Sequence, residues 1–338
     1  MRRHPHGSRR QCWLCRVIAV LAPGQGSQTP GMLGPWLTGP RAEQTDAAST
    51  VARWSESTGL DLAQLGTTAT ADEIKDTAVT QPLIVAAALL AYKQLLAALG
   101  GDEAGELALA GCPTAGHSVG ELAAAAIAGS LSADAAVELA AVRGREMAAA
   151  CALESTGMSA VLGGKPEEVL DRLAELGLDP ANQNGAGQVV AAGPIGALEQ
   201  LSANPPERAR VISLAVAGAF HTRFMAPAEE ALRGYADKLD FADPSRPMLS
   251  NADGTEVGSG AALRDRLVAQ VTLPVRWDLC MAALRDLGVG AVVELAPAGT
   301  LSGLVKRELR GTATLPLKSP DDLDKVAGLL AEHTGGTS

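Results

Sequence analysis

The sequence has few aromatic residues. Phe, Trp and Tyr together make up 3% of the 338 residues, whereas hydrophobic residues as a whole make up 47%. Alanine, leucine and valine must therefore fill the core. The remaining composition is that of an ordinary globular protein. Because a single domain usually has about 100 to 200 residues, we expect two compact units, or one unit with an insertion.

Cysteine is also scarce. The five cysteines are odd in number and mostly scattered, which excludes a disulfide framework and favours a reduced, cytoplasmic protein. Cys12 and Cys15 form a lone C-x-x-C pair, and no second pair or histidine cluster completes a metal or redox site. We therefore expect no metal centre.

Positive charge is in deficit, since 28 Lys and Arg face 38 Asp and Glu, for a net charge of −10. This excess of acidic residues argues against general nucleic-acid binding. The basic leader, residues 1–16, precedes an apolar run that is shorter than the roughly seven to fifteen residues of a signal peptide. The apolar stretch 82–100 contains Lys93 and Gln94, so we expect a buried helix there, with no membrane contact.

The first half of the chain predicts one buried strand, a long helical region, a short strand and two further helices. A β-branched apolar run at 17–22 predicts the strand, which enters a glycine-rich loop. The helical region is 46–98, and a short strand is expected at 110–115 because Pro113 fits poorly inside a sheet. Two helices follow at 118–128 and 133–150, the second capped by Ser132.

The pattern changes between residues 153 and 216. Strands are predicted at 158–164, 180–184, 188–193 and 209–216, with helices at 166–177 and 194–203. This β-α-β-β-α-β order is that of a ferredoxin-like α+β unit. Single buried strands return at 247–251 and 288–297. We therefore expect an α/β unit formed by 17–152 and 217–330, an inserted unit at 153–216, a leader at 1–16 and a tail at 331–338.

Ser118 stands in the pattern G-x-S-x-G at 116–120. In this pattern a strand turns sharply into a helix, so that the serine hydroxyl projects from the bend towards the positive end of the helix dipole. The alternative is a helix N-cap serine in a glycine-rich turn. As a base for the hydroxyl we favour His221, which follows a predicted strand, over a plain loop histidine. The other histidines are His117, expected to pack and to point away from Ser118, His4 and His6 in the leader, and His333 in the tail.

Six segments strengthen this interpretation: GQGSQ (24–28), GHSVGE (116–121), VRGREM (142–147), NGAGQVVAAG (184–193), GAFHT (218–222) and QVTLPVRW (270–277). In this order they resemble the malonyl-CoA:acyl carrier protein transacylases, acyltransferases of bacterial fatty acid synthesis that are also embedded in polyketide synthases. The resemblance covers residues 17 to about 320. It implies a hydrolase-like α/β core with a parallel sheet and a nucleophile elbow, plus an inserted ferredoxin-like α+β subdomain.

The resemblance also implies roles for individual residues. Ser118 would be the nucleophile and His221 its base, oriented by the main-chain carbonyl of Gln270. The backbone amides of Gln25 and Val119 would form the oxyanion hole. The substrate-binding residues would be Arg143, which clamps the malonyl carboxylate, with Met147, Asn184 and Phe220. Without the resemblance, Arg143 would be read as a solvated helix arginine and Phe220 as a core residue.

The expected reaction is ping-pong transfer of malonyl from malonyl-CoA, through a malonyl-serine, to the phosphopantetheine thiol of an acyl carrier protein. No cofactor would be bound, because the substrates carry CoA and phosphopantetheine, and a cytoplasmic monomer is expected. The alternatives are a hydrolase or thioesterase on a similar core, which would need no buried cation, and a carrier-protein-binding scaffold with a dead site. Intact Ser118 and His221 speak against the scaffold.

Overall fold

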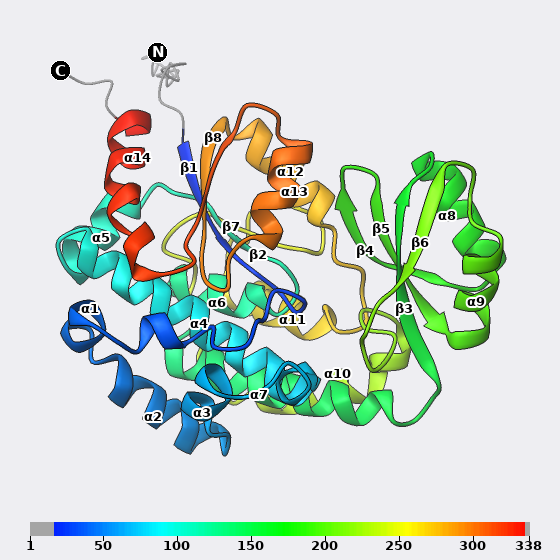
Figure 1. The fold of residues 1–338 in the computed structure, drawn as a ribbon, viewed down its shortest axis with the longest axis horizontal. Coiled ribbons are helices and arrows are strands. Elements are labelled where there is room, and N and C mark those ends of the chain that lie inside the picture. Colours follow the sequence, from blue (N-terminus) through cyan, green and yellow to red (C-terminus); the bar gives the residue numbers. More distant parts are fainter. Residues whose placement is uncertain (1–16, 335–338) are drawn as a thin grey trace, which may run out of the picture.

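The computed structural model describes residues 17–334, which form two sheets surrounded by helices (Figure 1). The large sheet is parallel, in the order β7-β2-β1-β8-β9. Its strands are β1 (Val17–Ala22), β2 (Thr114–Gly116), β7 (Met248–Leu249), β8 (Val289–Glu294) and β9 (Ala313–Pro316). The small sheet is antiparallel, in the order β4-β5-β3-β6. The predicted combination of a parallel α/β core and a small α+β unit is thus confirmed.

Helices cover both faces of the large sheet, and for this reason β1 and β8 are apolar apart from Glu294, the last residue of β8. All residues of β8, and residues 18–22 of β1, are buried, as expected of strands in a parallel sheet. The helices outside the small-sheet region are α1 (Pro40–Gln44), α2 (Ala47–Thr58), α3 (Leu62–Thr67), α4 (Thr77–Ala98), α5 (Asp102–Leu109), α6 (Gly120–Ile127), α7 (Ala133–Cys151), α10 (Ala226–Ala236), α11 (Gly260–Ala269), α12 (Trp277–Asp286), α13 (Thr300–Glu308) and α14 (Asp324–Thr334). Short 3-10 turns lie at Gly34–Trp36, Glu73–Lys75, Arg223–Met225 and Pro320–Asp322.

The apolar helix predicted at 82–100 is α4, a core helix. Among the described residues it is the one helix long and apolar enough to cross a membrane, yet 83% of its apolar window is buried inside the protein. It packs mainly against α7. Ser132 caps α7 as predicted, its hydroxyl oxygen accepting the N–H of Ala135 at 3.1 Å.

The small sheet contains β3 (Thr156–Gly163), β4 (Asp179–Gly185), β5 (Gln188–Pro194) and β6 (Ala209–Ser213), with helices α8 (Pro166–Glu175) and α9 (Ile195–Ala203). The predicted β-α-β-β-α-β order is therefore present. The two helices lie on the outer face of the sheet, at the right of Figure 1. Val161, Val169 and Leu173 belong to the apolar cluster on that face. Met158 and Val190 instead belong to the main hydrophobic cluster, which they share with the helices of the large sheet.

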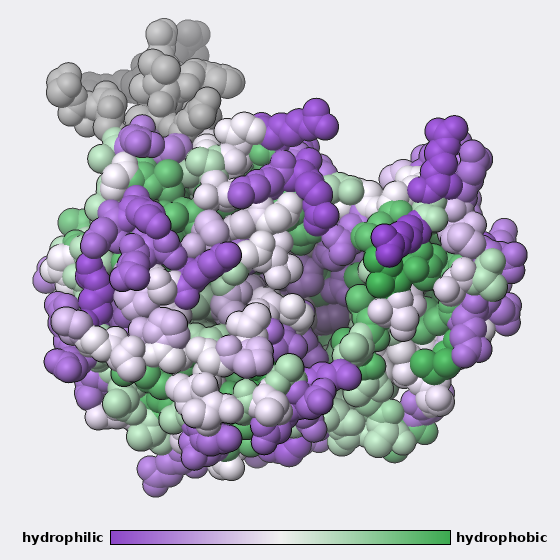
Figure 2. All heavy atoms as spheres, viewed as in Figure 1, coloured by the Kyte–Doolittle hydropathy of each residue, from purple (hydrophilic) through white to green (hydrophobic). Residues whose placement is uncertain are grey.

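The two sheets are joined through β4. The N–H of Gln183 donates to the carbonyl of Val275 at 2.9 Å, and the N–H of Val275 donates to the carbonyl of Ala181 at 2.9 Å. Because Val275 lies just before α12, this ladder ties the small sheet to the large-sheet side of the molecule. Figure 2 shows that this face of the molecule is hollowed between the two sheets.

Several element boundaries differ from the prediction. β2 begins only after Pro113, β6 ends at Ser213 where an apolar strand was expected to continue to 216, and β9 was not predicted. Residues 331–334 of the expected tail belong to α14. The leader, with Cys12 and Cys15, lies outside the described residues.

Candidate active site

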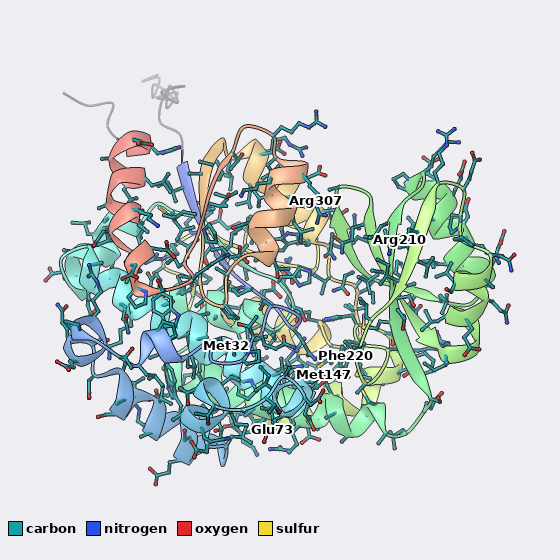
Figure 3. The ribbon with its side chains drawn as sticks, viewed as in Figure 1. Met32, Glu73, Met147, Arg210, Phe220 and Arg307 are labelled. Atoms are coloured by element: carbon teal, nitrogen blue, oxygen red, sulfur yellow. The ribbon has the colours of Figure 1, made fainter. Side chains whose placement is uncertain are left out.

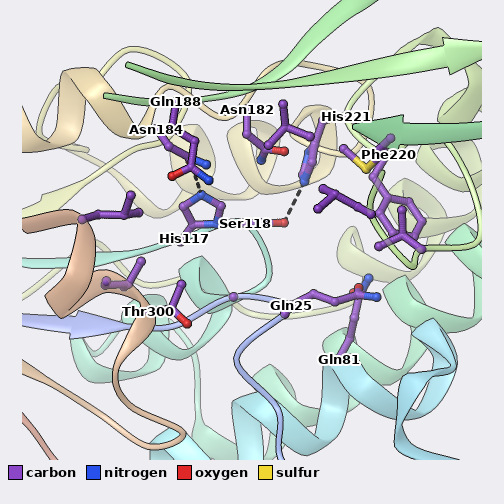
Figure 4. Close-up of a pocket in the computed structure, with 18 of the residues that line it drawn as sticks. Gln25, Gln81, His117, Ser118, Asn182, Asn184, Gln188, Phe220, His221 and Thr300 are labelled. Carbon is purple, nitrogen blue, oxygen red and sulfur yellow. Dashed lines mark hydrogen bonds between the residues drawn. The ribbon is translucent and has the colours of Figure 1, made fainter. Parts of the chain in front are cut away.

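A cavity of about 290 Å³ lies between the two sheets and contains most of the predicted site residues (Figure 4). Ser118, His221 and Arg143 line it, as do residues from the loop after β1 and from the small sheet. Segments that are far apart in the sequence therefore contribute to one site.

Ser118 occupies a sharp bend between β2 and α6. Its φ of +53° is in the left-handed region, which non-glycine residues adopt at a cost of about 1–3 kcal/mol and mainly at functional sites. The bend needs glycine on both sides. A Cβ on Gly116 would collide with the backbone of Gly120, and a Cβ on Gly120 would collide with the carbonyl oxygen of Ala22. The strand, the bend and the helix thus cross at van der Waals distance, and the hydroxyl projects from the crossing.

His221 lies beside the hydroxyl. Its Nε2 is 2.8 Å from the Ser118 Oγ, and its Nδ1 is 2.7 Å from the main-chain oxygen of Gln270. Because a carbonyl can only accept, Nδ1 carries the proton and Nε2 is left to accept from the serine. Burial and the nearby Arg143 charge lower the pKa of His221 to about 3, against the opposing effect of the bond to Gln270. The imidazole is therefore neutral at neutral pH, the form that a general base requires.

Arg143 is a buried arginine of α7, with 2% of its surface exposed. The alternative interpretation, a solvated helix arginine, is therefore wrong. Its guanidinium donates to the Gln81 Oε1 at 2.7 Å, to the Gln270 Oε1 at 2.9 Å and to the Ser118 Oγ at 3.3 Å. Burial lowers the pKa of Arg143 to about 10, which still leaves the group charged at neutral pH. A buried cation thus sits beside the serine hydroxyl.

The loop GQGSQ after β1 lies against the bend at Ser118. A Cβ on Gly24 would collide with the carbonyl oxygen of His117, so only glycine allows this approach. Gln25 lines the cavity, and Val119 is the residue that precedes α6. The backbone N–H groups of Gln25 and Val119 donate to no group within residues 17–334. Neither N–H group is therefore engaged by another group in the described part of the chain, and of the two residues Gln25 lines the cavity.

His117 lines the cavity, although only a packing role was predicted for it. Its ring packs edge-on against Trp277, with ring centroids 5.5 Å apart, as expected of a packing residue. Its Nε2 is also 2.8 Å from the Asn184 Oδ1 on β4 (Figure 4). Burial lowers the pKa of His117. This pair joins the large-sheet side of the cavity to the small sheet and places the predicted Asn184 in the site.

Met147 and Phe220, the remaining predicted site residues, also line the cavity. They are 1% and 5% exposed, and Figure 3 shows them in the region between the two sheets. Met147 accepts a hydrogen bond on its sulfur from the Gln81 Nε2 at 3.4 Å. Among the described residues, the one further histidine, His333, does not line the cavity. His333 lies on α14 with its Nδ1 at 2.9 Å from the Leu329 oxygen, and His4 and His6 are outside the described residues.

Three polar residues around the site were not predicted: Gln81, Glu121 and Asn251. Gln81 holds Arg143. The Asn251 Oδ1 accepts the N–H of Ser118 at 2.8 Å, and its Nδ2 donates to the Gly116 oxygen at 2.8 Å. Glu121 accepts the N–H of Asn251 at 2.6 Å. Only Glu121 belongs to a noted motif, GHSVGE. Nothing local marks the other two, because their partners lie 62 and 133 residues away.

No group of three His, Cys, Asp or Glu side chains within residues 17–334 is arranged to hold a metal ion. The cysteines Cys112, Cys151 and Cys280 are free thiols. Burial raises the pKa of each, to about 11 for Cys151. The reactive groups that line the cavity are the hydroxyl of Ser118, the imidazole of His221 and the guanidinium of Arg143.

Comparisons with known proteins place this geometry in context. The family model described as "Acyl transferase domain" matches residues 20–335. The malonyl CoA-acyl carrier protein transacylase of Mycobacterium tuberculosis H37Rv is 58% identical over 93% of this chain and 100% of its own. The Escherichia coli K12 enzyme of the same name is 31% identical over 90% of this chain and 96% of its own.

Solved structures agree with these relatives. The crystal structure of MCAT from Mycobacterium tuberculosis superposes with a TM-score of 0.86 at 58% identity, covering 92% of this chain and 100% of that one. A structure described as a type II PKS acyl-carrier protein in complex with its malonyl-transacylase matches with a TM-score of 0.81 at 30% identity, covering 91% of this chain and 97% of that one.

Proposed function

Because the chain belongs to the acyl transferase family, and within it to the malonyl-CoA:acyl carrier protein transacylases, we propose that it transfers the malonyl group of malonyl-CoA to an acyl carrier protein. The reaction would proceed through a malonyl ester on Ser118. It would supply malonyl carrier protein for fatty acid synthesis, with polyketide synthesis as a second use.

In the first half-reaction, Ser118 Oγ attacks the thioester carbonyl carbon while the neutral His221 Nε2 takes the hydroxyl proton. The 2.8 Å contact between these atoms already has hydrogen-bond geometry. Collapse of the tetrahedral intermediate breaks the carbon–sulfur bond, and the CoA thiolate takes the proton from His221. The main-chain oxygen of Gln270 holds the imidazole in the required tautomer throughout.

The free N–H groups of Gln25 and Val119 would bind the oxyanion of that intermediate. Donors of this kind contribute about 10²- to 10³-fold to the rate. The second half-reaction is the reverse, with a different thiol. The phosphopantetheine thiol gives its proton to His221, attacks the malonyl ester and releases Ser118 with its proton restored.

The observation that carries the malonyl assignment is the buried guanidinium of Arg143, within 3.3 Å of the Ser118 Oγ. A guanidinium offers parallel donors that match a carboxylate. A simple esterase or thioesterase has no use for a cation at this position, whereas a carboxylated acyl group needs one. Met147, Phe220 and the His117–Asn184 pair would form the walls around the acyl chain.

The remaining parts of the proposal follow from the same reaction. The protein would act as a monomer in the cytoplasm without a bound cofactor, since CoA and phosphopantetheine arrive with the substrates. The core unit would comprise 17–152 and 217–330, with 153–216 as the inserted subdomain. In support, the chain leaves the large-sheet side after α7 and returns to it only after β6.

Intact-mass spectrometry after incubation with malonyl-CoA tests the proposal. We expect one malonyl adduct on the wild-type protein, which holo acyl carrier protein removes and takes up. The Ser118→Ala variant should form no adduct, because it lacks the attacking oxygen. A malonyl adduct on that variant, or a wild-type protein that only hydrolyses malonyl-CoA, would contradict the proposal.

A further inference from the structure

Glu121 is a buried carboxylate that the proposed reaction does not use. It lies in the first turn of α6, three residues after Ser118, and is 1% exposed. Burying a charge is costly unless the charge is paired and hydrogen-bonded. Glu121 does not line the cavity, so it cannot touch a substrate there. Any effect it has on the reaction must pass through its neighbours.

The two oxygens of Glu121 have different partners. Oε1 accepts the N–H of Asn251 at 2.6 Å, and Asn251 in turn supports the bend at Ser118. Oε2 accepts the side-chain amide of Gln270. The carboxylate is therefore hydrogen-bonded to Asn251, which supports the nucleophile, and to Gln270, which orients the base.

Gln270 makes two separate contributions to the site. Its main-chain oxygen accepts the Nδ1–H of His221, while its side-chain Oε1 accepts the guanidinium of Arg143 at 2.9 Å. A side-chain amide has a donor end and an acceptor end, and only the acceptor end can hold a cation. Both oxygens of Glu121 accept hydrogen bonds, so Oε2 binds the donor end of the Gln270 amide and leaves its acceptor end facing Arg143.

We propose that Glu121 is a positioning residue for acyl selectivity: through the side chain of Gln270 it holds Arg143 beside Ser118, where the guanidinium meets the carboxylate of the acyl group. This inference rests on the proposed function, because it concerns the same serine and the same arginine. It assigns no role in bond making to Glu121 itself.

The Glu121→Gln substitution reverses the donor pattern at nearly constant size. If its oxygen keeps the N–H of Asn251, its NH2 group faces Gln270. The amide of Gln270 must then turn round, and its NH2 group would face the guanidinium of Arg143. Two donors cannot bind each other, so Arg143 loses one of its anchors while the main-chain oxygen of Gln270 stays in place for His221.

Single-turnover acylation of the full-length protein by malonyl-CoA and by acetyl-CoA tests this inference. The acetyl group lacks a carboxylate and reports on the nucleophile and base alone. We expect Glu121→Gln to lower the malonyl-to-acetyl ratio of rates about tenfold, as is typical of coupled neighbours. In an Arg143→Ala background, Glu121→Gln should change that ratio little, because the residue that it acts through is gone.

Two further variants keep the test decisive. Gln270→Met retains the main-chain oxygen but removes the side-chain amide, so it should lower the ratio in the same way even if Glu121→Gln folds poorly. Glu294 is a matched control: it is 0% exposed and accepts the N–H groups of Leu301 and Ser302 at 2.9 and 2.8 Å. Glu294→Gln should lower the melting temperature and leave the ratio unchanged.

The inference is overturned if Glu121→Gln slows both acyl groups equally, or if it changes the ratio by the same factor with and without Arg143. Either result would give Glu121 a structural role only. These outcomes differ from a failure of the proposed function, in which the wild-type protein itself would form no malonyl-enzyme.

Discussion

At the scale of single residues, the site depends on groups in environments that they rarely occupy. Ser118 and His221 both have a left-handed backbone, with φ of +53° and +59°, and both side chains are buried. Arg143 is charged and 2% exposed. Left-handed backbone and buried charge both cost stability, and they persist where the surrounding structure holds them in place. Measuring both the reaction rate and the stability of variants at these positions should therefore show which features serve the reaction and which serve the fold.

Phe220 is expected to limit the acyl group to an unbranched one. It lines the cavity next to His221 in the chain, and its ring would occupy the space that an α-methyl branch needs. Phe220→Ser should raise transfer of methylmalonyl relative to malonyl, by up to the roughly 10- to 200-fold that one methyl group is worth. Competition between the two CoA thioesters in one assay measures this ratio.

Phe224 provides the control for that experiment. It is half-buried, lies outside the cavity and stacks with Arg223 at 4.6 Å from the ring centroid. Phe224→Ser should therefore leave the ratio of the two substrates unchanged. An unchanged ratio in a folded, active Phe220→Ser protein would place the selectivity elsewhere in the cavity wall.

The buried imidazole of His221 should make stability depend on pH. Its pKa is lowered to about 3 in the folded protein but is about 6.5 in an unfolded chain. Between about pH 3 and about pH 6.5 the imidazole is protonated in the unfolded state only. The contribution of His221 to stability is therefore fully present above the unfolded pKa and is lost as pH falls towards the folded pKa. From about pH 6.5 to about pH 5, His221 should cost the wild-type protein about 2 kcal/mol.

Urea unfolding of the wild type and of His221→Gln at both pH values measures this contribution. The free energy of unfolding should fall less for the variant, by roughly the stated amount. Burial raises the pKa of Glu121 to about 7, so Glu121 stabilises the folded protein more as pH falls, opposite to His221. Both proteins contain Glu121, so the comparison removes this effect. Equal losses in the two proteins would show that His221 is not held neutral.

At the scale of elements, the site depends on how closely β1, β2 and α6 approach one another. Gly120 opens α6, and a Cβ there would also lie 2.6 Å from the carbonyl oxygen of Pro23, in the segment that leads to Gln25. Gly120→Ala should therefore move this loop away from the bend. We expect a loss of about 1–3 kcal/mol of stability, the usual cost of overpacking, together with slower acylation.

Gly196 is a matched control in the first turn of α9, where a Cβ would meet no atom within 4 Å. Gly196→Ala should stabilise the protein by up to about 1 kcal/mol through the helix preference of alanine. Urea unfolding and single-turnover acylation measure both effects. If Gly120→Ala had the same stability and rate as Gly196→Ala, the close approach at Gly120 would not matter.

At the scale of the whole molecule, the two sheets share one hydrophobic cluster. Met158 and Val190 of the small sheet belong to the same cluster as Phe220 and the helices around the large sheet. The ladder at Val275 and the His117–Asn184 pair add polar links. The small sheet therefore has an apolar cluster of its own on the face covered by α8 and α9, and its other face shares the main cluster, where the two parts meet at the cavity.

We expect the described part of the chain to unfold in a single transition. Near-ultraviolet circular dichroism reports on the buried Trp36, Trp54 and Trp277 around the large sheet, while hydrogen exchange of β5 reports on the small sheet. Both probes should give the same midpoint in urea, as two-state unfolding requires. Exchange of β5 at distinctly lower urea would mean that the small sheet opens independently.

Local patterns in the sequence determined most of the fold and the chemistry. The apolar run of β1, the capping serine of α7 and the β-α-β-β-α-β order of 156–213 are all short-range signals, because backbone periodicity and turn chemistry act between near neighbours. The glycines around Ser118 belong to the same class. The loop position of His221 after a predicted strand favoured it as the base, and the resemblance then singled out Gln270 and Arg143. The structure brings all three together with Ser118.

Only the tertiary structure decided how these groups are held. Gln81, Asn251 and the carboxylate of Glu121 meet their partners across 62 to 149 residues of chain, and no periodicity or turn signal encodes such a contact. The structure likewise decided that Arg143 is buried and that His117 lines the cavity. Burial and hydrogen bonding depend on which surfaces pack against one another, and that packing exists only once the strands and helices have assembled around the cavity.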